Sequence, residues 1–151
     1  MQTDPKTVRC KRLDPRAKMP VYATSGAAAA DLCAALDAPL TLAPGQRAII
    51  PTGVAVQLPG PQWVALLCAR SGLAVKRGLT LSNGVGVIDS DYRGEIGAGV
   101  VNLGEEPVTV EPGERVAQLM ILPVAQGTFV QAETLDDTHR GAGGFGSTGR
   151  L

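Results

Sequence analysis

Residues 96–124 read IGAGVVNLGEEPVTVEPGERVAQLMILPV, and this stretch carries the clearest information about the fold. Three short runs rich in valine, isoleucine and leucine, at residues 96–103, 108–110 and 116–124, are separated by turns that contain proline and glycine. Short apolar runs between turn-forming residues are typical of antiparallel strands. Their repetition predicts an all-β domain, either a sandwich or a closed antiparallel sheet.

The same alternation of short apolar runs and turn-forming residues extends toward the N-terminus. Prolines and glycines separate four further expected strands, at residues 47–50, 54–58, 63–68 and 85–88. No stretch shows the 3.6-residue period of a long amphipathic helix. At most one short helix is expected, over Ser71–Arg77, with Ser71 in a position to cap it.

Two segments need separate treatment. Residues 27–30 are four alanines, which favour a helix by propensity, yet Gly26 before them and Asp-Leu-Cys after them are equally compatible with an extended chain. Residues 1–18 carry six basic and two acidic groups. We interpret this basic start as a solvated edge strand, because lysine commonly protects such edges.

The composition limits the class of protein. The 151 residues fit one domain, and with 44% hydrophobic but only 3% aromatic residues its core must be aliphatic. The 14 basic residues balance the 14 acidic residues. This balance argues against a partner that is bound mainly by charge, such as nucleic acid or a membrane surface.

The cysteines and the single histidine limit which disulfide and metal sites the protein can have. Cys10, Cys33 and Cys68 are odd in number and far apart, so they are interpreted as buried thiols of a reducing compartment. With His139 alone, a zinc or iron site built from protein ligands is not expected. The sequence shows no leader and no long apolar run, and we expect a cytoplasmic protein.

Residues 83–95, NGVGVIDSDYRGE, contain the strongest candidate site. Glycines there let the backbone approach a flat ligand closely, while Asp89 and Asp91 follow an apolar run at a point that water can reach. The pattern indicates a site that recognises a ring with main-chain groups and acts on it with a carboxylate. For Asp91, a role in shaping the turn is the better interpretation.

Three other segments have the chemistry of phosphate binding. Arg70-Ser71-Gly72 offers a cation, a hydroxyl group and open amides. Residues 112–118 place Arg115 and Gln118 after a turn, although each also fits an ordinary surface residue. Residues 140–149 are half glycine and include arginine, serine, threonine and one phenylalanine. A terminal glycine-rich stretch is often disordered, but these residue types also bind anions.

Together these segments resemble, in order, the five motifs of the trimeric deoxyuridine triphosphatase (dUTPase) family. The matching segments are residues 28–34, 70–74, 83–94, 113–118 and 140–149. The resemblance implies a β-jelly roll assembled as a homotrimer, with active sites between subunits. It implies Mg²⁺-dependent hydrolysis of dUTP to dUMP and pyrophosphate, which limits uracil incorporation into DNA and supplies dUMP for dTMP synthesis.

The resemblance also implies roles for single residues. Asp89 would be the general base that activates water, and Tyr92 would pack against the deoxyribose. Uracil would be recognised by Asn83 and by the backbone that includes Gly86, Val87 and Ile88. The phosphates would be held by Arg70, Ser71, Gly72, Gln118, Arg140, Gly146, Ser147 and Thr148, with Phe145 closing over the base.

Asp31 would support waters around a Mg²⁺ ion carried mainly by the triphosphate. The first motif usually has a Gly-Tyr or Gly-Leu pair before its Asp-Leu, whereas this chain has Ala29-Ala30. A turn-capping role for Asp31 is therefore the alternative.

The resemblance divides the chain into a jelly-roll domain, residues 1–138, and a glycine-rich flexible arm, residues 139–151. We expect the arm to be mobile in the free enzyme and ordered by dUTP analogues. Rival interpretations are a dCTP deaminase-like enzyme of the same fold, a trimer that binds dUTP without turnover, and a purely structural jelly roll.

Overall fold

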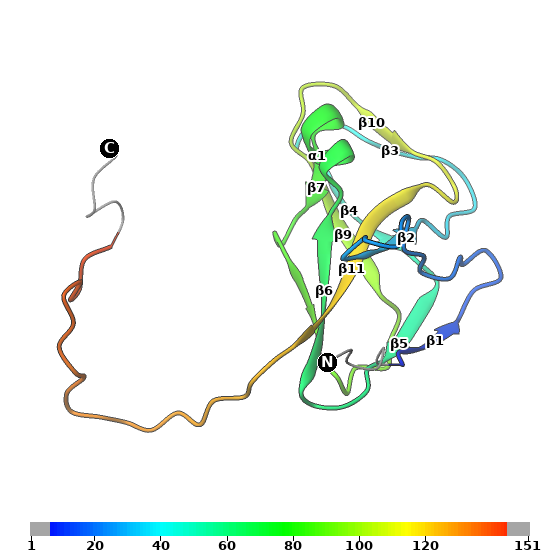
Figure 1. Ribbon diagram of the computed structural model, residues 1–151. Coiled ribbons are helices and arrows are strands. Elements are labelled where there is room, and N and C mark those ends of the chain that lie inside the picture. Colours follow the sequence, from blue (N-terminus) through cyan, green and yellow to red (C-terminus); the bar gives the residue numbers. More distant parts are fainter. Residues whose placement is uncertain (1–6, 145–151) are drawn as a thin grey trace.

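The computed structural model of the chain describes residues 7–144, which form eleven strands and one short helix (Figure 1). The strands are β1 (Arg9–Arg12), β2 (Ala30–Cys33), β3 (Leu40–Leu42), β4 (Arg47–Pro51), β5 (Val54–Gln57), β6 (Trp63–Ala69), β7 (Leu79–Leu81), β8 (Gly86–Ile88), β9 (Gly97–Asn102), β10 (Val108–Val110) and β11 (Arg115–Pro123). Helix α1 (Ser71–Arg77) lies between β6 and β7.

The strands form four antiparallel groups. The largest is a four-stranded sheet in the order β2-β11-β6-β8, and a second sheet has the order β4-β9-β7. Two further pairs are β1 with β5 and β3 with β10. This arrangement, with one short helix, confirms the prediction of an antiparallel all-β jelly-roll fold.

The core between the sheets is aliphatic, as the composition predicts. Its fully buried side chains include Leu32, Leu42, Ile50 and Val110. The buried amide of Asn102 donates to the backbone oxygens of Leu42 and Glu106, so it does not lie unpaired in the core.

Helix α1 has the predicted bounds, but the predicted cap is wrong. Arg70 occupies the N-cap position without a side-chain hydrogen bond to the helix, and Ser71 is the first helical residue. At the other end Gly78 adopts a left-handed conformation with φ of 72°. A Cβ atom there would lie 2.4 Å from the backbone nitrogen of Gly104, so the glycine ends the helix where two segments meet closely.

The two ambiguous segments are both extended. Of the alanine run, Ala30 begins strand β2 and the preceding residues are not helical. The basic start contains β1, an exposed edge strand whose only partner among the described residues is β5, as predicted. The helix propensity of the alanines does not decide the structure here, because β2 pairs with β11 and buries Leu32.

The chain leaves the sheets after Pro123. Residues 124–140 are exposed and extend away from the rest of the molecule in Figure 1, where they are drawn in orange and red. Phe129, Val130 and Leu135 are 101%, 80% and 88% exposed. The predicted boundary between domain and arm at residue 138 stays a prediction. The last strand, β11, ends at Pro123, fifteen residues before that boundary.

All three cysteines are free and half-buried, which is less buried than predicted. Burial raises the pKa of the Cys10 and Cys33 thiols. Among residues 7–144, no helix has both the length and the apolar character needed to span a membrane.

Candidate active site

A cavity of about 260 Å³ opens beside β8, between the two larger sheets. Its walls come from the end of β6, the β7–β8 turn, the segment after β8, and the start of β9. The lining residues are Leu67, Asn83, Gly86, Val87, Ile88, Asp89, Tyr92, Glu95, Ile96, Gly97 and Gly99. The structure therefore brings together most of the residues predicted from the third motif.

Glycines keep this cavity open. A Cβ atom at Gly86 would lie 3.0 Å from the Cβ of Leu67, and one at Gly97 would lie 2.8 Å from Cγ2 of Ile49. A side chain at Gly86 would therefore crowd the wall that Leu67 forms, and one at Gly97 would collide with β4. A flat ring can instead approach the backbone directly.

Strand β8 is the edge strand of the four-stranded sheet and pairs with β6 alone among the described residues. The N–H and C=O groups on its other side face no strand, so they can bind a ligand edge. The turn before it is fixed by Gly84, which has φ of 74°, and by hydrogen bonds from the amide of Gly84 to Leu81 and from that of Val85 to Asn83.

Asp89 and Tyr92 lie on the exposed loop that follows β8. The Tyr92 amide donates to the Asp89 carbonyl oxygen at 3.2 Å, and the Tyr92 hydroxyl donates to the Glu95 carbonyl oxygen at 2.9 Å. The Asp89 carboxylate is exposed and makes no ion pair with the described residues. It is therefore available to a water molecule or a ligand.

A second cluster of charged groups lies where β2, β6 and β11 meet. Asp31 accepts from Arg70 Nε at 3.1 Å on one carboxylate oxygen and from Arg115 Nη1 at 3.0 Å on the other. Arg70 also donates to the Arg115 carbonyl oxygen at 3.1 Å. Asp31 thus lies in a strand between two arginines, so the turn-capping alternative is wrong.

The other predicted phosphate residues lie close to this cluster. Gln118 pairs with Asp31 in the β2–β11 register and donates to the Ala69 carbonyl oxygen at 2.9 Å. Ser71 and Gly72 form the exposed first turn of α1, directly after Arg70. Arg115 was predicted either as part of a phosphate-binding segment or as an ordinary surface residue, and its ion pair with Asp31 places it in this cluster.

Asp89 and Arg70 are well separated within one chain. Ile88 pairs with Ala65, so Asp89 lies beyond the N-terminal half of β6, whereas Arg70 follows Ala69 at its other end. At roughly 3.3 Å per residue, the length of β6 places them about 20 Å apart. The structure therefore does not bring the predicted base and the predicted phosphate-binding residues together.

The predicted arm residues lie neither at the cavity nor in the charged cluster of this chain, as far as the structure describes them. Arg140 is exposed, far along the extended segment, and its Nε donates to the Gly143 carbonyl oxygen at 2.9 Å. Phe145, Gly146, Ser147 and Thr148 lie outside the described residues, so their roles stay predictions.

Comparison with known proteins identifies the family of this chain. The family model described as dUTPase matches residues 15–149, nearly the whole chain. The chain belongs to the dUTPase family. A deoxyuridine 5'-triphosphate nucleotidohydrolase of Desulfitobacterium hafniense (strain DSM 10664 / DCB-2) is 58% identical over 138 residues, which cover 91% of this dUTPase and 91% of the relative. That of Paraburkholderia phymatum is 51% identical and covers 93% and 96%.

Solved structures agree with this assignment. The dUTPase of Staphylococcus bacteriophage 80alpha with dUPNHPP has a TM-score of 0.88 at 30% identity, covering 95% of this chain and 99% of that one. A mutant dUTPase from phage phi11 of S. aureus, studied for its coordination of a structural Mg(II) ion, has a TM-score of 0.76 at 27% identity, covering 85% and 97%.

Proposed function

We propose that this dUTPase converts dUTP into dUMP and pyrophosphate by attack of water on the α-phosphorus, with Asp89 as the general base. The observation that supports this role is an exposed carboxylate at the mouth of a small glycine-lined cavity. Phosphoryl transfer to water needs little covalent chemistry from the protein. A positioned base and a set of charge-neutralising donors are sufficient parts.

Uracil fits the cavity beside β8. The free backbone edge of Gly86, Val87 and Ile88, together with the Asn83 amide, offers both donors and acceptors to the edge of the ring. Cytosine presents a different donor and acceptor pattern and would leave these groups mismatched. Sites of this kind reject mispaired analogues by up to about 10⁴–10⁵.

Tyr92 supplies the contact with deoxyribose. Its ring is held by the hydroxyl bond to Glu95, and a Cβ atom at Gly94 would lie only 2.4 Å from that hydroxyl oxygen. The ring therefore lies over a glycine backbone in a defined position. In this position it leaves no room for a 2′-hydroxyl group on the sugar.

The triphosphate is bound by Arg70, Ser71, Gly72 and Gln118. Arginine contacts phosphate oxygens through charge-assisted hydrogen bonds, and Asp31 fixes the direction of the Arg70 guanidinium. One N–H of Gln118 is used by Ala69, and the second can donate to the ligand. In the arm, Arg140 and residues 145–148 would complete the grip on the distal phosphates.

Mg²⁺ fits this site as an ion that the triphosphate carries. It usually keeps several waters and binds through one or two carboxylates and the substrate phosphates. Residues 7–144 hold no group of three or more His, Cys, Asp or Glu side chains that could bind a metal alone. Asp31, the acid beside the phosphate donors, would hold the ion through water. When bound, Mg²⁺ neutralises phosphate charge.

The active site is proposed to form between subunits of a homotrimer. A general base must lie within hydrogen-bond reach of its water, directly or through one other water. The attacked phosphate must therefore lie beside Asp89, whereas Arg70 of the same chain is about 20 Å away along β6. We infer that a neighbouring copy supplies its phosphate-binding cluster to the cavity.

The surface of the chain supports such an assembly. The outer face of the four-stranded sheet carries Val64, Leu66, Met120 and Leu122 in paired register, and Val87, opposite Leu66, is 66% exposed. The extended segment after Pro123 leaves three large apolar side chains fully open to water. The four sheet residues are half-buried. Apolar surface that stays partly or fully exposed favours burial against another chain.

By removing dUTP, the enzyme would limit uracil incorporation into DNA and provide dUMP for dTMP synthesis. The free thiols of Cys10, Cys33 and Cys68 support a reducing compartment such as the cytoplasm, which cell fractionation tests.

Asp89→Asn tests the base directly. It should lower kcat by about 10²–10⁴ and leave the affinity for dUPNHPP near that of the wild type, because the amide keeps the shape but cannot accept the proton. Pyrophosphate release and calorimetric titration measure the two quantities. Asp91→Asn is the matched control on the same exposed turn and should keep wild-type turnover. Normal kcat in Asp89→Asn would show that another group is the base.

A further inference from the structure

Residues 89–95 connect two different sheets. They leave β8 of the four-stranded sheet and enter β9 of the three-stranded sheet. Within this loop Arg93 Nη1 donates to the carbonyl oxygens of Ser90 and Tyr92, at 2.8 Å and 2.9 Å. The loop is thus internally bonded, and the position of Asp89 and Tyr92 depends on how its two ends are held.

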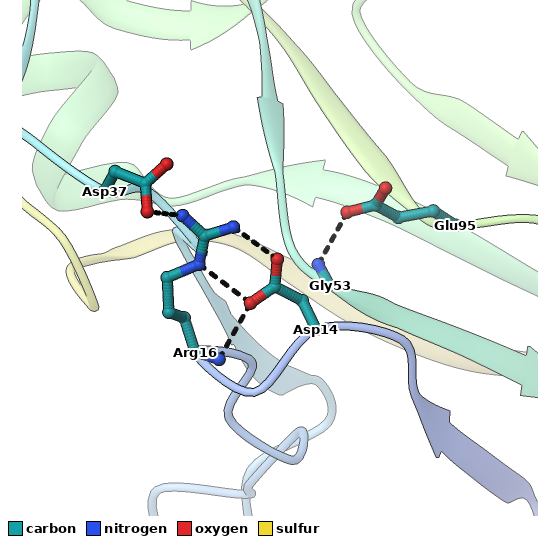
Figure 2. A network of polar contacts seen from close by, with 5 residues as sticks. All are labelled: Asp14, Arg16, Asp37, Gly53 and Glu95. Atoms are coloured by element: carbon teal, nitrogen blue, oxygen red, sulfur yellow. Dashed lines mark hydrogen bonds and ion pairs between the residues drawn. The ribbon is translucent and has the colours of Figure 1, made fainter.

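The far end of the loop is held by Glu95. One oxygen of its carboxylate accepts from the Gly53 amide at 2.7 Å (Figure 2). Its own carbonyl oxygen accepts from the Tyr92 hydroxyl, and the next amide, of Ile96, donates to Val54 at 2.8 Å. Glu95 therefore joins the tyrosine ring to the turn between β4 and β5, and its side chain also lines the cavity.

The turn that receives Glu95 is fixed in place. Gly53 is buried with φ of 67°, and a Cβ atom there would lie 2.7 Å from the Cβ of Ala17 and 2.9 Å from that of Asp14. Its carbonyl oxygen accepts from the Leu13 amide at 2.7 Å. A buried amide in such a rigid turn needs an acceptor, and the Glu95 carboxylate provides it.

We propose that Glu95 is a positioning residue for the reaction: its carboxylate fixes the end of the 89–95 loop to the Gly53 amide and thereby sets the place of Tyr92 and Asp89. The inference depends on the roles proposed above for those two residues. Glu95 itself touches neither the reacting phosphorus nor the attacking water.

The test compares selectivity, as kcat/KM for dUTP divided by kcat/KM for UTP, in Glu95→Ala, Glu95→Gln and Tyr92→Ala. Because misplacement by about 1 Å can cost about 10²-fold, Glu95→Ala should lose roughly that factor in kcat/KM for dUTP and at least about 10-fold in selectivity. Glu95→Gln keeps an oxygen acceptor at the same reach and should stay within about threefold of the wild type. Should Glu95→Ala fail to fold, Glu95→Asp, which is too short to reach Gly53, should show the same loss.

Val110→Ala is the control for a loss that is only structural. Val110 is fully buried in β10, which pairs with β3, away from the loop. It should lower the melting temperature and keep the selectivity of the wild type. If Glu95→Ala and Glu95→Asp behave like Val110→Ala while Tyr92→Ala loses selectivity, the role of Glu95 is overturned and that of Tyr92 stands. If Tyr92→Ala also keeps selectivity, the proposed sugar contact is overturned together with the inference.

Discussion

Asp31 accepts a hydrogen bond from a different arginine on each of its carboxylate oxygens, Arg70 on one and Arg115 on the other. Its side chain is only 14% exposed. This geometry suits a group that orients two cations toward a ligand. Ala29 and Ala30, which replace the usual residues of the first motif, do not disturb this geometry. Ala30 begins β2, and the strand register places Asp31 opposite Gln118.

Asp31→Asn distinguishes arginine orientation from support of the metal's water shell. Hydrogen bonds to charged groups contribute about 1.5–3 kcal/mol, so loss of orientation should raise KM for dUTP roughly 10–100-fold at saturating Mg²⁺. Initial rates measured over a range of dUTP and Mg²⁺ concentrations separate the two effects. An unchanged KM with a higher Mg²⁺ requirement would instead assign Asp31 to the metal.

The sequence could indicate residues whose chemistry is local. Asp89, Asn83 and Tyr92 stand in one short glycine-rich segment, and the structure places them around one cavity. The contacts that Arg115 and Glu95 make could not be predicted in the same way. Their partners, Asp31 and Gly53, are 84 and 42 residues away in the chain, and only the folded register brings them together.

At the scale of elements, the N-terminal segment supports the site through a small ionic network. Arg16 pairs with both Asp14 and Asp37, next to the turn that holds Glu95 (Figure 2). The hydrogen bond from the Arg16 side chain lowers the pKa of Asp14 to about 2. The folded state therefore binds a proton at Asp14 less readily than the unfolded chain does.

This shift predicts a pH-dependent contribution to stability. A lowered pKa stabilises the fold above the ordinary value of 3.8 and loses that effect as pH falls toward about 2. Arg16→Ala should therefore lower the melting temperature at pH 5–7 by a small amount, since the pair is exposed, and the difference from wild type should shrink by about pH 2. Thermal unfolding followed by circular dichroism measures it. An equal difference at both ends of this range would contradict the assignment.

Most of the strands predicted from the sequence are apolar runs between turn-forming residues, and β1 was predicted from its basic charge. The strands it did not predict include β3 and β7, which are both Leu-Thr-Leu segments of three residues. Their pairing with β10 and β9 comes from contacts distant in sequence. The helix bounds were predictable, but the N-cap was not. Arg70 occupies the N-cap position, and its side chain pairs with Asp31 rather than with the helix.

At the scale of the whole molecule, one chain keeps the proposed base apart from the proposed phosphate-binding residues. Asp89 and Arg70 lie near opposite ends of β6. The chain after Pro123 extends away from the sheets (Figure 1). The buried indole N–H of Trp63 has no acceptor among the described residues. Trp63 pairs with Pro123, the last residue of β11 before the extended segment. The proposed homotrimer would account for these features, because neighbouring copies would complete each other's sites.

Complementation between two inactive variants tests this assembly most directly. Asp89→Asn chains keep the phosphate-binding cluster, and Arg70→Ala chains keep the base. If each site takes these parts from different subunits of a closed ring, equal mixing should restore about one quarter of all sites, and about one third of the sites in trimers that contain both variants. Differently tagged chains, unfolded together, refolded and purified through both tags, give the mixed trimers whose pyrophosphate release is measured. We predict activity far above that of either parent; mixed trimers no more active than the parents would show that each chain builds its site alone.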